Sequence, residues 1–197
     1  MKKKSKVLLL SFLFVLLIIG AKFTYDALSK NSKFSPSNIV IEEGEGTVSK
    51  ETQDTQEEKT PAYDFTVIGT NGKEINLSDF IGKPVVLNFW ASWCPPCKGE
   101  MPDFNEMYLE YGDTIEFMMV NMTDGVRETI EKGQTYVDKK GFSFPVFFDT
   151  TQEAASLYGI SSIPTTLFID KEGYLIAGAE GAISKETLSK GIDLIKP

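Results

Sequence analysis

The chain has 197 residues, two cysteines and no histidine, and its formal net charge is −8. The absence of histidine excludes catalytic triads and proton relays that depend on imidazole, together with the commonest zinc sites, and two cysteines alone cannot complete a four-sulfur metal site. The excess of acidic residues argues against nucleic acid as a partner, because phosphate binding requires clustered cations. We therefore expect no cofactor, and a chemistry that depends on thiols, carboxylates or the backbone.

The first 25 residues have the pattern of a membrane-targeting segment. Four lysines within residues 2–6 precede an apolar run from Val7 to Ala21. Extended as a helix to Tyr25, this run spans about 28 Å, close to the ~30 Å hydrocarbon core of a bilayer. We interpret residues 1–25 as a single-pass signal anchor in the cell membrane, with the lysines in the cytoplasm and the remaining chain on the extracytoplasmic side. A cleaved signal peptide is the alternative, although small residues do not occupy the positions that a cleavage site needs.

The rest of the chain divides into a polar part and a globular part. Residues 26–60 are rich in Ser, Thr, Glu and Gln and show no sustained hydrophobic periodicity, which predicts a flexible tether. Residues 61–197 have the composition of a globular protein, and their number suits one domain with a sizeable core. We expect this domain to be a monomer that the tether holds near the membrane.

The globular part begins with the signal of a hairpin. Asp64–Ile68 and Glu74–Leu77 are predicted strands on either side of an Asn71-Gly72 turn. A short turn capped by its first residue is expected at Ser78–Phe80. Pro84–Trp90 is an almost continuous apolar run, which is typical of a strand buried on both faces of a sheet.

Helices and strands alternate after this run. Thr123 or Asp124 is expected to cap the second of the predicted helices. The order of elements, with a late hairpin, predicts an α/β fold with a mixed central sheet flanked by helices. The predicted helices are Pro95–Glu110, Val126–Lys140, Gln152–Tyr158 and Ser184–Ile195, and the predicted strands are Ile115–Asn121, Pro145–Phe148, Thr165–Asp170 and Tyr174–Ala179.

The two cysteines lie where the strand Pro84–Trp90 ends and the next helix begins. Cys94 falls at the N-cap of that helix, where free amides and the helix dipole favour a thiolate. Cys97 follows within one turn, so the two sulfurs can form a disulfide. We predict that Cys94 is the exposed attacking thiol and that the more buried Cys97 resolves the mixed disulfide. Pro96 removes one amide that could have solvated the Cys94 thiolate, so we expect only moderate acidification.

Three other interpretations of the cysteine pair are weaker than redox chemistry. A structural disulfide across two residues closes a very small loop and stabilises the fold by only roughly 2 kcal/mol in the chain-entropy model. A metal site would need further cysteines or histidines, which the sequence lacks. An inert pair is unexpected at the start of a helix beside two tryptophans. Thiol–disulfide exchange is therefore the predicted chemistry.

Two segments carry a resemblance to a known family. Asn88–Pro102 (NFWASWCPPCKGEMP) resembles the membrane-anchored thioredoxin-like reductases of the TlpA/ResA type, and Tyr158–Asp170 is similar to the second active-site loop of that family. The resemblance covers residues 61–197. It implies a thioredoxin-like fold with an N-terminal hairpin and a central strand–helix insertion.

The resemblance also implies the residues that bind substrate. Pro164 is expected to follow Ile163 through a cis peptide bond and to lie against the cysteine pair, where the backbone pairs with an extended substrate. A trans proline that starts a strand is the alternative, and it is the commoner form of an X–Pro bond. Trp93 and Pro95 are placed on the same substrate-binding surface, although Trp93 is equally compatible with core or surface packing.

Glu100 is the candidate for handling protons. In the family a carboxylate at this place is partly buried near the sulfurs, which implies that Glu100 holds a proton for Cys97 and tunes both thiol pKa values. A solvated glutamate on the helix surface is the alternative. Asn88 occupies the strand position where cytoplasmic thioredoxins carry a buried Asp, and this departure moves the proton-handling role toward Glu100.

The resemblance implies a reductase that opens disulfides in exported proteins, with apocytochrome c as the first substrate class to consider. A membrane thiol transporter is expected to recharge the dithiol, because the sequence contains no cofactor motif. A disulfide-forming oxidase is one alternative, although Pro95-Pro96 supplies no histidine between the cysteines. A non-catalytic docking module for exported partners is another. A peroxidase would need a peroxidatic cysteine outside the Cys-x-x-Cys pair, and the sequence contains none.

Overall fold

The computed structural model describes residues 59–196. The predicted signal anchor, and the predicted tether up to residue 58, lie outside the described residues. Within residues 59–196, none of the helices combines the length and the apolar composition that crossing a bilayer requires.

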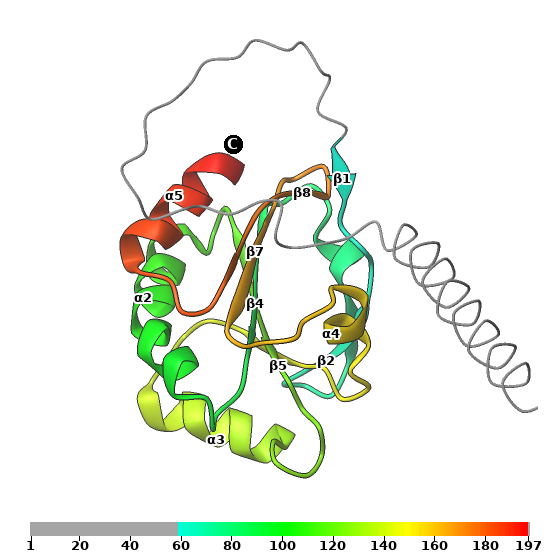
Figure 1. Ribbon diagram of the computed structural model, residues 1–197, viewed down its shortest axis with the longest axis vertical. Helices are drawn as coiled ribbons and strands as arrows, with labels where there is room; N and C mark the ends of the chain where they lie inside the picture. Colours follow the sequence, from blue (N-terminus) through cyan, green and yellow to red (C-terminus); the bar gives the residue numbers. More distant parts are fainter. Residues whose placement is uncertain (1–58, 197) are drawn as a thin grey trace, which may run out of the picture. The chain divides into compact units, whose positions relative to one another are not determined.

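Residues 59–196 form a mixed sheet of eight strands with helices on both faces (Figure 1). Two pairs of neighbours run parallel, β4 with β5 and β5 with β6, and the other pairs run antiparallel. The predicted mixed sheet is thus confirmed. The order across the sheet is β1 (Thr60–Pro61), β8 (Tyr174–Glu180), β7 (Thr165–Ile169), β4 (Val85–Trp90), β5 (Glu116–Asn121), β6 (Val146–Phe148), β2 (Thr66–Gly69) and β3 (Glu74–Asn76).

Helices cover both faces of the sheet. The face that carries the larger apolar core is covered by α2 (Pro95–Tyr111), α3 (Ile130–Lys140) and α5 (Lys185–Ile195). The other face carries α4 (Glu153–Leu157) and the 3-10 turn η2 (Leu77–Phe80). Figure 1 shows α2 and α5 on the opposite side of the sheet from α4.

Strand β4 lies in the middle of the sheet, and all of its residues are buried. Val86 and Trp90 belong to the core that α2, α3 and α5 cover, whereas Phe89 faces the other side and contacts Tyr158 with ring centroids 6.1 Å apart. Asn88 shares the face of Val86 and Trp90, because side chains alternate along a strand. The strand therefore places a polar amide inside the core next to α2.

The hairpin and the insertion expected from the family resemblance are both present. β2 and β3 pair antiparallel around Gly72, whose φ of 74° is a conformation that glycine adopts readily. The helix and strand of the insertion are α3 and β6, which lie between β5 and α4. β1 was not predicted: Thr60, expected in the tether, pairs with Leu175 of β8. A two-residue strand that contains proline carries no alternating pattern by which it could be recognised.

The predicted start of the second long helix is wrong. The sequence suggested Val126, capped by Thr123 or Asp124, whereas α3 begins at Ile130 and its N-cap is Thr129. The Asp124 carboxylate instead accepts hydrogen bonds from the amides of Val126 (2.8 Å) and Glu128 (2.9 Å). An aspartate followed by glycine can close a turn as readily as it caps a helix, and here it closes a turn.

Two glycines provide a matched test of how α5 packs on β7. A Cβ atom on Gly191 would overlap the ring of Phe168, whereas a Cβ atom on Gly99 of α2 would meet nothing within 4 Å outside its own helix. We expect Gly191→Ala to lower the free energy of unfolding by about 2–3 kcal/mol, because overpacking forces side chains out of their rotamers. Gly99→Ala should raise it by up to about 1 kcal/mol, since alanine favours a helix interior. Denaturant unfolding measures both, and equal effects at the two positions would contradict this packing.

Candidate active site

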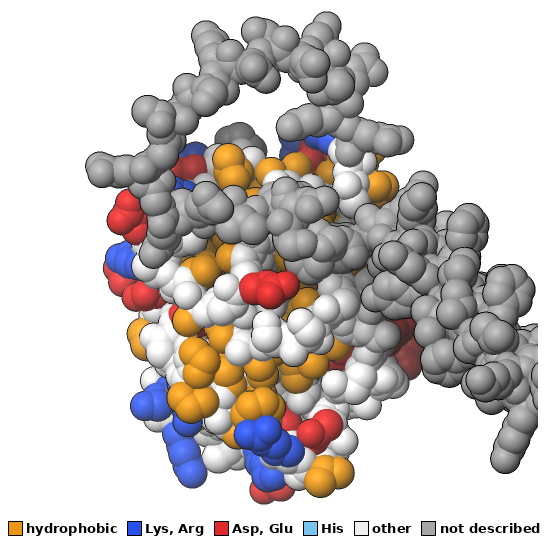
Figure 2. Space-filling model, viewed as in Figure 1, with side chains coloured by type: hydrophobic (Ala, Val, Ile, Leu, Met, Phe, Trp, Pro, Cys, Tyr) orange, Lys and Arg blue, Asp and Glu red, His pale blue; other side chains and the backbone are white. Residues whose placement is uncertain are grey.

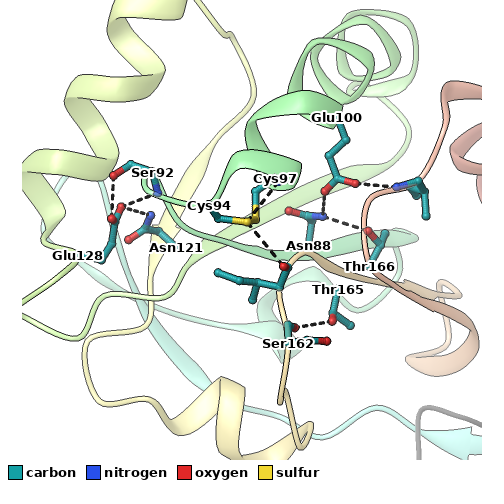
Figure 3. Close-up of a disulfide and its surroundings, with 12 residues drawn as sticks. Asn88, Ser92, Cys94, Cys97, Glu100, Asn121, Glu128, Ser162, Thr165 and Thr166 are labelled. Carbon is teal, nitrogen blue, oxygen red and sulfur yellow. Dashed lines mark hydrogen bonds between the residues drawn. A yellow bond between two sulfur atoms is a disulfide. The ribbon is translucent and has the colours of Figure 1, made fainter.

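Strand β4 leads directly to the cysteine pair at the start of α2. Cys94 is the N-cap residue, with an extended backbone (φ −84°, ψ 111°), and Cys97 is the third residue of the helix. Their sulfurs form a disulfide with an S–S distance of 2.08 Å (Figure 3). The predicted N-cap position of Cys94 and the predicted pairing of the two sulfurs are both confirmed.

The first helical turn offers the Cys94 sulfur a single amide. The N–H of Cys97 donates a hydrogen bond to Cys94 Sγ at 3.3 Å. The two residues between the cysteines, Pro95 and Pro96, occupy the first helical positions and have no N–H. A thiolate at Cys94 therefore receives less stabilisation from the helix start than a sequence without prolines would give it.

Both cysteines are buried, although burial was expected only for Cys97. Cys97 is fully buried, as expected for a resolving thiol, but Cys94 is only 2 % exposed, so the prediction of an exposed Cys94 is wrong. The carbonyl oxygen of Ile163 lies 3.6 Å from Cys94 Sγ. The half-buried side chains of Trp93 and Ile163 pack against the core cluster that contains both cysteines.

The loop before β7 brings a cis proline to the cysteines. The Ile163–Pro164 peptide bond is cis, as expected from the family resemblance. A groove of about 370 Å³ lies beside Cys94, since its lining includes Trp93, the preceding residue, and Ile163, whose carbonyl oxygen contacts the sulfur. Pro95 is exposed at the start of α2 and does not line this groove. The groove is lined by Trp93, Met122, Asp124, Gln152, Ile160, Ser161, Ser162 and Ile163.

Glu100 is buried, with 3 % of its surface exposed, so it is not the solvated glutamate that was the alternative. Its Oε1 accepts a hydrogen bond from Asn88 Nδ2 at 3.0 Å, and its Oε2 accepts one from the backbone N–H of Ile183 at 2.9 Å (Figure 3). Burial raises the pKa of Glu100 from 4.5 to about 7, and the two hydrogen bonds limit the rise. The carboxyl group can therefore take up or release a proton near neutral pH.

Asn88 is the neutral partner of this carboxyl group. Its Nδ2 also donates to Thr166 Oγ1 at 3.0 Å, so the amide bridges α2 and β7. An aspartate here would place a second carboxylate next to Glu100, and like charges in a buried site cannot both ionise without a large cost. Asn88 thus leaves Glu100 as the one acidic group of this buried cluster, in line with the role expected for it.

A second buried carboxylate near the cysteines was not predicted. Glu128 is fully buried, and its carboxylate accepts hydrogen bonds from the backbone N–H of Ser92 (3.0 Å), from Ser92 Oγ (2.7 Å) and from Asn121 Nδ2 (2.8 Å) (Figure 3). The sequence did hold one indication of this polar cluster: Ser92 follows the buried strand β4, and Asn121 ends the neighbouring strand β5. Polar side chains at the carboxyl ends of parallel strands meet at one edge of a sheet.

The arrangement suits thiol–disulfide exchange. A sulfur at a helix start lies beside a groove, a second sulfur lies one turn further on, and a carboxyl group with a pKa near neutrality lies one turn beyond that on the buried face of the same helix. Exchange needs a thiolate to attack and a place for the proton of the second thiol. Helix α2 and its N-cap residue supply each of these groups.

Comparison with known proteins agrees with this chemistry. Residues 59–177 match the AhpC/TSA family. The thiol-disulfide oxidoreductase ResA of Geobacillus thermodenitrificans is 36% identical over 137 residues, which are 69% of this chain and 76% of that protein. ResA of Bacillus subtilis is 36% identical over 141 residues, 71% of this chain and 76% of that protein.

Two solved structures share the fold. StoA from Bacillus subtilis has a TM-score of 0.58 at 27% identity and covers 68% of this chain and 98% of its own. The exposed lipoprotein thioredoxin Etrx1 of Streptococcus pneumoniae has a TM-score of 0.56 at 36% identity and covers 67% of this chain and 100% of its own. The chain therefore belongs to the AhpC/TSA family, among the ResA-type thiol-disulfide oxidoreductases of thioredoxin-like fold.

Proposed function

We propose that the Cys94–Cys97 pair works as a reductant and opens disulfide bonds in exported proteins on the extracytoplasmic side of the cell membrane. The Cys94 thiolate attacks one sulfur of the substrate disulfide, and the other substrate sulfur leaves and takes up a proton. Cys97 then gives up its proton and attacks Cys94 Sγ, which releases the second substrate thiol. The reaction leaves the protein with the Cys94–Cys97 disulfide, so the protein is oxidised by two electrons and the substrate is reduced by two.

The observation that carries the reducing direction is the single amide at Cys94 Sγ. A strongly oxidising pair owes its power to a stabilised reduced form, chiefly a stabilised thiolate. With Pro95 and Pro96 at the first two helical positions, only the Cys97 N–H reaches the sulfur from this turn. A weakly stabilised thiolate makes the disulfide form the more favourable one, and a pair of this kind donates electrons.

Glu100 supports the second half of the cycle. Cys97 must lose its proton before it attacks, and Glu100 lies one turn further along the same buried face of α2. Because its pKa is raised to about 7, the carboxylate form is available at neutral pH and is basic enough to accept a proton. A role for Glu100 as the proton acceptor of Cys97 follows from this position and pKa.

The location and the partners are part of the proposal. The lysine-flanked apolar run in residues 1–25 supports a signal anchor with the domain outside the cytoplasm. A membrane thiol transporter would then return the dithiol to its reduced form. Apocytochrome c is the first substrate to test, since its cysteines must be reduced before haem attachment. We propose that the domain acts as a monomer.

The redox midpoint tests the direction. We expect a value near that of thioredoxin, about −270 mV, and far from the roughly −120 mV of a strong oxidant. Equilibration with glutathione buffers, followed by alkylation and mass measurement, gives the fraction of reduced protein. Pro96→Ala restores an amide near Cys94 Sγ and should raise the midpoint. A wild-type value near −120 mV would show instead that the pair forms disulfides.

A further inference from the structure

The loop of residues 122–129, between β5 and α3, is braced although its tip is exposed. Val126 at the tip is 85 % exposed. Beneath it, the Asp124 carboxylate accepts the amides of Val126 and Glu128. Lys132 Nζ, from the first turn of α3, donates to the carbonyl oxygens of Arg127 (2.8 Å) and Val126 (3.2 Å). The loop therefore presents its side chains in a fixed position.

Glu128 ties this loop to the residue that precedes Trp93. Both groups that Ser92 can donate, its N–H and its hydroxyl, point to the Glu128 carboxylate. Asn121, at the end of β5, donates to the same oxygen as the Ser92 N–H. Burying a carboxylate is costly unless hydrogen bonds satisfy it, and here the bonds connect the loop to Ser92 after β4 and to Asn121 at the end of β5. The contacts do not reach the sulfurs.

Arg127 holds the tryptophan itself. The carbon at the centre of its guanidinium lies 3.4 Å from the centroid of the Trp93 ring, which is close stacking. Trp93 is half-buried and also packs against the apolar core. The ring is thus fixed from the backbone side by Ser92 and from the outer side by Arg127.

We propose that Glu128 and Arg127 are positioning residues that hold Trp93 as one wall of the groove beside Cys94, and that this groove takes an apolar side chain next to the reacting cysteine of a protein substrate. The inference rests on the proposed function, because it assigns the groove to the protein substrate of the same cysteine pair. Figure 2 shows hydrophobic side chains gathered in the lower half of the face in view, over the region between α2, α3 and α4.

The lining of the groove supports an apolar occupant. Met122, Ile160 and Ile163 are all half-buried and line it together with Trp93. Of the polar residues that complete the lining, Asp124, Ser161 and Ser162 are exposed and Gln152 is half-buried. An apolar side chain beside the substrate disulfide would be covered by this wall, whereas a small disulfide without neighbouring residues would gain nothing from it.

The position of each hydrogen bond suggests a conservative variant. The Ser92 N–H and Asn121 Nδ2 share Glu128 Oε1, and Ser92 Oγ meets Oε2 alone. A glutamine can keep both bonds on its oxygen, and its amide group can donate to the Ser92 hydroxyl. Glu128→Gln should therefore hold the Trp93 backbone as the wild type does, whereas Glu128→Ala removes both acceptor oxygens and with them all three hydrogen bonds. Arg127→Gln removes the stacked cation at an exposed position.

The test compares kcat and KM for a protein disulfide, insulin, with those for bis(2-hydroxyethyl) disulfide, in the full-length protein. We expect Arg127→Gln to lower the ratio of the two kcat/KM values about fivefold through a higher KM for insulin, as the loss of one exposed cation–π contact implies. Glu128→Ala should act in the same direction, and Glu128→Gln should restore the ratio. Lys171→Gln, which removes an exposed cation of the β7–β8 turn, is the matched control and should leave the ratio at the wild-type value.

Three results would overturn the proposal: a wild-type ratio in Arg127→Gln, a parallel fall for both substrates in that variant, or a Glu128→Gln protein that behaves like Glu128→Ala. If Glu128→Ala does not fold, Arg127→Gln decides alone. This test of the groove does not depend on whether the protein reduces or oxidises its substrates. Should the wild type oxidise proteins rather than reduce them, the same ratio is measured with a reduced, unfolded protein and a small dithiol as the two substrates.

Discussion

Cys94→Ser is expected to lower the rate of protein disulfide reduction to that of the uncatalysed reaction. Cys94 carries the sulfur at the helix N-cap, beside the carbonyl oxygen of Ile163 and the groove. A serine hydroxyl cannot form a disulfide with the substrate, so the cycle stops before its first step. The effect should exceed that of every other substitution in the domain, and reduction of insulin by the pre-reduced protein measures it.

Cys97→Ala provides the comparison that separates attack from resolution. This variant keeps the Cys94 thiol but lacks the thiol that releases the substrate, so it should react once and then remain attached. A single turnover followed by arrest is the expected time course. If Cys94→Ser reacted once and Cys97→Ala did not react, the roles of the two cysteines would be reversed. If both variants kept wild-type activity in cells, the domain would be a docking module.

Glu100→Gln is expected to change how the stability of the oxidised protein depends on pH. In the folded state burial raises the pKa of Glu100 from 4.5 to about 7. Below pH 4.5 the group is protonated in both states, and between pH 4.5 and 7 the unfolded chain releases the proton while the folded protein keeps it. The wild type should therefore lose about 3 kcal/mol of unfolding free energy through this group as the pH rises from 4 to 8.

A glutamine cannot ionise, so the variant should lose less stability over the same pH range. Glutamine also loses one of the two acceptor contacts, which lowers stability at every pH, and the diagnostic quantity is therefore the change with pH. Urea unfolding of wild type and variant at pH 4, 6 and 8 gives that change. Glu131→Gln, at an exposed position of α3, controls for the removal of a carboxylate. Parallel pH curves for wild type and Glu100→Gln would contradict the raised pKa.

Much of the fold could be predicted because the decisive signals are local. Val85–Trp90 is apolar along its whole length, and a strand of this kind is buried on both faces. The Asn71-Gly72 pair specifies its hairpin turn, since glycine readily takes the positive φ that the turn needs. The cysteines follow a buried strand and open a helix, so their N-cap and first-turn positions follow from the sequence alone.

The environment of Glu100 could be predicted only in part from the sequence. The buried residues of α2 include Cys97, Met101 and Phe104, and a spacing of three to four residues places Glu100 on the same face. The pattern can thus indicate that Glu100 points inward. It cannot supply the amide of Asn88 from β4 or the backbone of Ile183, because those partners come from segments far away in the chain.

The features that sequence reasoning missed share one physical cause. Asp124-Gly125 can cap a helix or close a turn, and the choice depends on Glu128, which is drawn toward Ser92 and Asn121 in other segments. A glutamate near a predicted helix start is normally read as a solvated residue. Likewise, the enclosure of Cys94 depends on the loop that ends in Ile163 and Pro164. Tertiary contacts between distant segments decided each of these points.

The central claim is that Cys94 attacks the disulfides of exported proteins and Cys97 resolves the product. Trapping tests it most directly: the full-length Cys97→Ala protein is expressed in its native cell, and proteins attached to it by disulfide bonds are isolated and analysed by mass spectrometry. We expect covalent complexes joined through Cys94 to exported proteins, which a thiol reductant releases and which are absent from Cys94→Ser,Cys97→Ala cells. Complexes with cytoplasmic proteins only, or none through Cys94, would contradict the account.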